Sequence, residues 1–146
     1  MKRTRLLLTV LVLSLTAFLT GCDELKKTQE QCERLVIYCD AGLQVVVELR
    51  QSKLLEDSAA EDILRIVTRV RDSTQIFLNR AQGYQKFDKE SKADLARLFV
   101  DVTTGIRELQ QAGVIHMKTP QAAQRFNRVM AGLDIAARLI QSRLRP

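Results

Sequence analysis

Apolar residues recur three and four positions apart along most of the chain, the spacing that places them on one face of an α-helix. Four such stripes begin near residues 24, 58, 88 and 119. They comprise Leu25, Cys32, Leu35, Val36, Cys39, Leu43 and Val46; Ile63, Ile66, Val67, Val70, Thr74, Phe77, Ala81 and Tyr84; Leu95, Leu98, Phe99, Val102, Ile106 and Leu109; and Ala123, Phe126, Met130, Leu133, Ala137, Ile140 and Leu144. Polar residues occupy the opposite face of each segment, so the helices must pack together to bury their stripes.

This pattern predicts an all-α fold, an up-down-up-down four-helix bundle, because short connections make successive helices antiparallel. The alternative is a three-helix bundle in which the first helix extends as a stalk. Two Pro, six Gly and no Trp in 146 residues also favour helices over a turn-rich β-sandwich.

Residues that start and stop helices refine the boundaries. Ser58-x-x-Glu61 predicts a capping box at the start of the second helix. Gly83 and Gly113 are expected to end the second and third helices, with Gly83 in the left-handed conformation. In the fourth helix Thr119 is the expected N-cap, followed by Pro120 at the first helical position.

The first 22 residues have a different pattern. A basic start, Met1 to Arg5, precedes an apolar run from Leu6 to Leu19 that is too short to cross a bilayer, for which ~20 residues are needed. The segment then closes on Leu19-Thr20-Gly21-Cys22, which resembles the lipobox of bacterial lipoproteins. That resemblance implies a diacylglycerol on Cys22, cleavage of the signal just before it, and acylation of the new amino group.

The expected organisation is therefore a signal peptide (1–21), an acylated cysteine with a short tether (22–31) and a helical domain (32–146). An uncleaved anchor and an ordinary cleaved signal are the alternatives, and both also place the domain outside the cytoplasm. The lipoprotein would be anchored in a cell membrane and face the periplasm or the exterior. Asp23 resembles the signal that retains such proteins in the inner membrane of enteric bacteria.

Cleavage would remove three basic residues and no acid, leaving 20 basic and 17 acidic residues and lowering the net charge from +6 to about +3. Much of the apparent basicity thus belongs to the signal, and no nucleic-acid partner is expected. In the predicted topology, Arg138, Arg143 and Arg145 return to the membrane end, where they could face anionic headgroups. Solvated helix faces are the alternative interpretation.

The two loops at the opposite end carry apolar side chains that could cap the core or form a partner surface. These residues are Leu54, Leu55, Val114, Ile115 and Met117.

Cys32 and Cys39 are the other thiols of the chain. On one helix their α-carbons would be ~10.5 Å apart, beyond the ~7 Å that a disulfide tolerates. Buried free thiols, a bridge across a non-helical loop and disulfide-linked dimers are the three interpretations. The position of both residues on the apolar stripe favours the first.

No catalytic motif and no metal-binding pattern is present in the sequence. His116 and Met117 could suggest haem ligation, but both are expected in a turn rather than inside a bundle. No cofactor is expected beyond the lipid on Cys22.

The leading prediction is a non-catalytic, membrane-anchored lipoprotein whose helical domain binds or supports another cell-envelope protein. One alternative is a carrier of a small apolar ligand or haem, which a cavity lined by Phe77, Phe99, Phe126 and Met130 would support. Another is an exclusion or immunity lipoprotein of a plasmid or phage.

Overall fold

The computed structural model describes residues 2–145, and their side chains from residue 23 onward. Within this part the chain forms four helices and no strand: α1 (Lys2–Gln51), α2 (Asp57–Gln82), α3 (Lys89–His116) and α4 (Pro120–Leu144). The connections between them are short. The all-α prediction is therefore confirmed.

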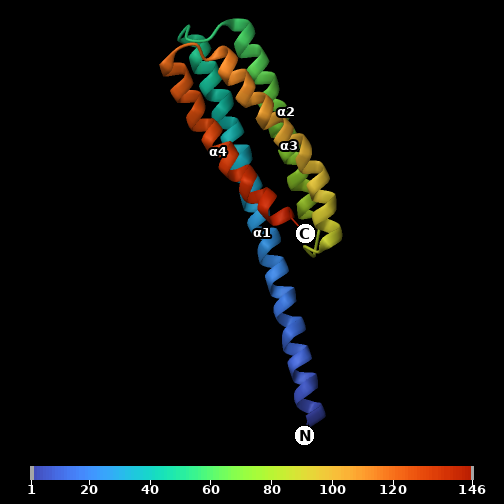
Figure 1. Ribbon diagram of the computed structural model, residues 1–146. Coiled ribbons are helices and arrows are strands. Elements are labelled where there is room, and N and C mark those ends of the chain that lie inside the picture. The colour runs from blue at the N-terminus through green and yellow to red at the C-terminus, as the bar shows by residue number, and fades with distance from the viewer. Residues whose placement is uncertain (1, 146) are drawn as a thin grey trace.

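The four helices pack against each other in a ring. α1 and α3 each contact both α2 and α4. Figure 1 shows the first part of α1, in blue, projecting beyond the other three helices, while its second half lies among them. The three-helix alternative is wrong, because α1 packs against both α2 and α4 as one of the four helices of the bundle.

Polar contacts identify the two ends of the bundle. At one end, here called the base (residues 23–30, 80–94 and 141–145), the Gln29 amide donates to the carbonyl oxygen of Ala81 at 3.1 Å. At the other end, here called the tip (residues 48–59 and 113–125), Lys118 pairs with Glu56 at 3.4 Å and Arg125 with Glu48 at 2.9 Å. Within the described part of the chain, helices α1 to α4 run between the base and the tip.

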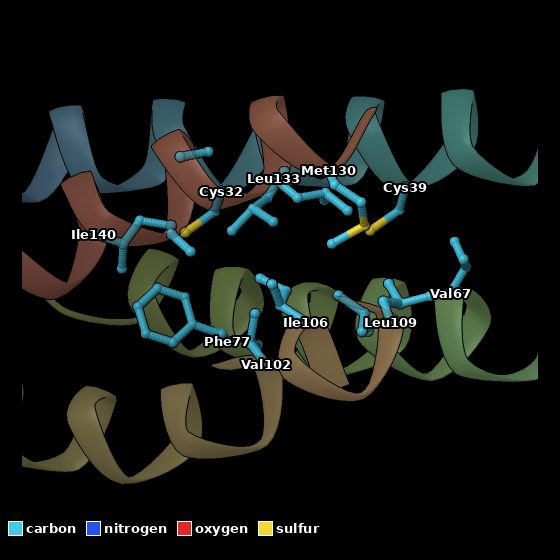
Figure 2. Close-up of a cluster of buried hydrophobic side chains, with 14 of the residues drawn as sticks. Cys32, Cys39, Val67, Phe77, Val102, Ile106, Leu109, Met130, Leu133 and Ile140 are labelled. Carbon is cyan, nitrogen blue, oxygen red and sulfur yellow. The ribbon is translucent and has the colours of Figure 1, made fainter. Parts of the chain in front are cut away.

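The predicted stripes form most of the core. Most of their members are buried, including Thr74, whose hydroxyl donates to the carbonyl oxygen of Val70. The rings of Phe77 and Phe99 pack edge to face with their centroids 5.2 Å apart. Figure 2 shows side chains from all four helices interdigitating in one continuous row. At the base, Phe87 of the α2–α3 turn closes the core.

Two of the predicted helix boundaries are wrong, and a third is right in position but not in conformation. α2 starts at Asp57 with Glu56 as N-cap, and no side chain caps it, so the Ser58 capping box does not form. Gly83 ends α2 in a right-handed conformation (φ −76°), because its N–H bonds the carbonyl of Arg80 without a left-handed turn. Gly113 does not end α3, which continues one turn further to His116.

The start of α4 and that of α3 agree with expectation. Thr119 accepts a hydrogen bond from the N–H of Ala122 at 3.2 Å, and Pro120 follows it. Asp88 accepts from the N–H of Ser91 at 3.0 Å, which lowers the pKa of the Asp88 carboxyl. Both caps satisfy amides that a helix start leaves unpaired.

Gly105 marks a close approach of α3 to α2. A Cβ on Gly105 would lie 2.5 Å from Cγ2 of the buried Val70, a short, stiff side chain. We expect Gly105→Ala to destabilise the protein by about 1–3 kcal/mol in urea unfolding, because overpacking outweighs the better helix propensity of alanine.

Gly132→Ala is the matched control. Its Cβ would also lie 2.5 Å from a neighbour, but that atom is Cε1 of Tyr38, whose ring is 37% exposed and can swing outward. The substitution is expected to be neutral or slightly stabilising. Equal losses at the two positions would contradict this account of the α2–α3 contact.

Candidate functional sites at the two ends of the bundle

The predicted lipidation site, Cys22, lies outside the residues whose side chains are described. α1 runs through this position without a break. Packing begins almost at once: Leu25 and Thr28 are already buried. The segment 22–31, expected as a tether, is therefore largely part of the bundle from Leu25 onward.

Asp23, the predicted sorting residue, is exposed at the start of the described side chains. Its carboxylate pairs with Lys27, one turn further along α1, at 2.5 Å. The pair lies on the solvent side of α1, where both partners are more than half exposed.

The three arginines predicted to face the membrane do not share one environment. Arg138 pairs with Asp134 at 2.8 Å and lies six residues, or ~9 Å, before the end of α4. Arg145 is exposed at the base itself. Arg143 is half-buried, and its enclosed Nη1 donates no hydrogen bond within the described part of the chain. Of these three arginines, Arg143 and Arg145 lie at the base and Arg138 does not.

A small polar cluster ties α2 to α3 at the base. The Tyr84 hydroxyl and the Arg80 Nε both donate to Oδ2 of Asp94. These two hydrogen bonds, that from Tyr84 first, hold the pKa of the Asp94 carboxyl below its ordinary value. The cluster keeps the Asp94 carboxyl ionised, and its negative charge is paired with Arg80.

The five residues predicted as a partner surface fall into a buried group and an exposed group at the tip. Leu55 and Met117 are buried and cap the core, and Leu54 is half-buried. Val114 and Ile115, by contrast, are 87% and 64% exposed. They remain exposed because the last turn of α3, which the sequence does not predict, holds them on a helix rather than folding them over the core.

A groove of about 530 Å³ lies between α3 and α4 beside Val114. Its larger apolar lining residues are Met117, Phe126 and Met130. Gly113, Ala123 and Ala131 also line the groove, and because these residues are small, the groove reaches close to the helix backbones. Gln110, Asn127 and Asp134 supply polar groups. The spacing of the sequence predicts Phe126 and Met130 as core residues and Met117 as a cap or partner-surface residue, and no local pattern indicates the groove.

His116 is the last residue of α3 and lines a different, smaller hollow of about 190 Å³, with Leu55 and Lys118. Met117 lines the α3–α4 groove instead. The two side chains therefore face different cavities. Of the four residues whose cavity would support a ligand carrier, Phe77 packs on Phe99 in the core, whereas Phe126 and Met130, which are also buried, line the α3–α4 groove.

Cys32 and Cys39 are free thiols, fully buried in α1. Figure 2 shows both pointing into the row of core side chains. Burial raises the pKa of each thiol to about 12, with smaller contributions from Glu33 and Asp40 respectively. The interpretation as small apolar core residues is thus confirmed, and a bridge through a non-helical loop is wrong because the intervening residues are helical.

No group of three or more His, Cys, Asp or Glu side chains that could hold a metal occurs among the described side chains. Over the same residues, none of the helices is both long and apolar enough to cross a membrane. Comparison with known proteins finds no matching family model, no matching curated protein and no matching solved structure.

Proposed function

We propose that this protein is a lipid-anchored envelope lipoprotein whose tip binds an amphipathic helix of another envelope protein. The observation that carries the proposal is the exposure of Val114 on the rim of the α3–α4 groove. An apolar side chain held on a rigid helix end, beside an apolar groove, is the kind of feature that marks protein contacts.

The groove has the composition of a helix-binding site. Its lining is largely apolar and includes two methionines, whose side chains can adapt their shape to a partner. Gln110 and Asn127 can supply hydrogen bonds beside it. An amphipathic partner helix laid along such a groove would bury its apolar face and leave its polar face in water.

The position of the groove suits an anchored protein. The contacts at the base and the tip support an up-down-up-down order of the helices, in which Cys22 and the groove lie toward opposite ends. A lipid on Cys22 would then present the groove away from the bilayer, in the periplasm or at the cell exterior. Asp23 favours the inner membrane within this proposal.

The proposal predicts that Val114→Lys abolishes capture of the partner. Crosslinking in intact cells, followed by detection with an antibody to this protein, should show a discrete adduct for the native chain. We expect the adduct to fall at least ~10-fold in the variant, because placing an unpaired lysine charge in an apolar contact costs more than the ~1.4 kcal/mol that a tenfold change requires. Lysine near the end of α3 is compatible with the helix dipole.

Val100→Lys is the matched control. Val100 is on the same helix, is 57% exposed and lies fourteen residues, or ~21 Å, from Val114. Its substitution should leave the adduct unchanged. Equal adducts in the native chain and the Val114 variant, or equal losses in both variants, would refute the groove as the binding site.

A further inference from the structure

The distance between the lipid and the bundle is short. Cys22 precedes the buried Leu25 by three residues on an uninterrupted helix, a rise of ~4.5 Å. If Cys22 carries acyl chains, as the proposed function holds, no flexible spacer separates the base from the headgroups. The base must therefore meet the membrane surface.

The acids of the base are largely engaged within the protein. Asp94 takes part in the polar cluster with Tyr84 and Arg80, and Asp88 caps α3. The remaining ion pairs are Asp23 with Lys27 at 2.5 Å and Glu24 with Lys92 at 3.3 Å. Most of the negative charge at this end is thus compensated by neighbouring groups.

Several cations of the base have no such compensation. Lys26, Lys89 and Arg145 are exposed, and none forms an ion pair with a described side chain. Arg143 adds an enclosed Nη1 without an acceptor among the same residues.

Glu30 and Glu90 are exposed acids of the base that form no ion pair within this described set, and Asp88 forms none either although it caps α3. Over its three segments the base carries eight basic side chains and six acidic ones. The uncompensated charge of the base is therefore positive.

We infer that the base is a membrane-docking surface, on which Lys26, Lys89, Arg143 and Arg145 contact the phosphates of anionic lipids. Basic side chains close to a bilayer are attracted to anionic headgroups, and this attraction acts over about one Debye length, ~8 Å at physiological salt. The acyl chains and the base then act together. They hold the bundle upright on the membrane and direct the α3–α4 groove outward.

Native lysines report this contact without any substitution. The full lipidated protein is reconstituted into vesicles of phosphatidylcholine alone, or of equal parts phosphatidylcholine and phosphatidylglycerol. Both samples are labelled briefly with an amine-reactive reagent and analysed by mass spectrometry. Labelling of Lys26 and Lys89 should be about fivefold lower in the anionic vesicles, the factor expected for one basic side chain near such a surface.

Lys53 is the internal control, because it is exposed at the tip. Its labelling should be equal in the two vesicle types. High salt should restore labelling of Lys26 and Lys89 in the anionic vesicles, because 1 M salt shortens the Debye length to ~3 Å.

Two results would overturn the inference, and the mass of the Cys22 peptide distinguishes them. If Cys22 carries lipid but Lys26 and Lys89 label equally in both vesicle types, the base does not dock, while the lipid anchor and the groove are unaffected. If Cys22 carries no lipid, the proposed anchor fails and the docking surface fails with it.

Discussion

Cys22→Ser is expected to abolish incorporation of labelled palmitate into the protein. The resemblance of residues 19–22 to a lipobox implies a thioether between the Cys22 sulfur and the diacylglycerol, and a serine hydroxyl provides no sulfur for this bond. Cells expressing either protein are grown with labelled palmitate, and the immunoprecipitated protein is examined on a gel. The effect should be all or none.

Cys39→Ser is the control for this experiment, because it also removes a thiol. The Cys39 side chain is fully buried, and its pKa of about 12 leaves almost no thiolate near neutral pH. Its loss should leave the palmitate label intact. Label retained in Cys22→Ser would show that the lipid is on another residue, and no label in the native protein would show that the signal is of another kind.

Phe77→Ala is expected to cause a loss of stability of about 3–5 kcal/mol, the usual cost of removing a large aromatic side chain from a packed core. Phe77 is fully buried and packs edge to face on Phe99. Since the whole free energy of unfolding of a small domain is about 5–15 kcal/mol, this is a large fraction of it. Urea unfolding followed by circular dichroism measures the change.

Its neighbour Ile76 provides the control, because it is 59% exposed on the same helix. Ile76→Ala should change the stability by no more than about 0.5 kcal/mol, as most surface substitutions do. A loss below ~1 kcal/mol for Phe77→Ala would mean that the core around Phe99 is loosely packed. Such a result would favour a ligand-binding bundle over a filled one.

Much of the fold could be predicted from the sequence because helical periodicity is a local property. Each stripe needs only the spacing of apolar residues along its own segment, and Phe77, Val102 and Leu133 are buried as that spacing requires. Thr119 with Pro120 likewise specifies a helix start through neighbouring backbone groups alone.

Boundaries that depend on distant contacts were not predictable in this way. Glycine is common at helix ends, yet α3 continues through Gly113. The α-carbon of Gly113 faces the Phe126 ring of α4. A Cβ there would lie 2.4 Å from the Phe126 ring. The glycine is thus placed by a helix–helix contact, which no local rule reveals.

By itself, the sequence determined the four amphipathic helices, most of the core and the prediction of a lipid on Cys22, since each follows from short-range spacing or a local motif. Only the tertiary structure decided which apolar residues at the tip stay exposed, how α3 and α4 enclose a groove, and which charges at the base are already paired. Those features depend on residues far apart in the chain: Val114 is left outside and Met117 inside by the packing of α3 on α4, and Glu24 is paired by Lys92 across the bundle.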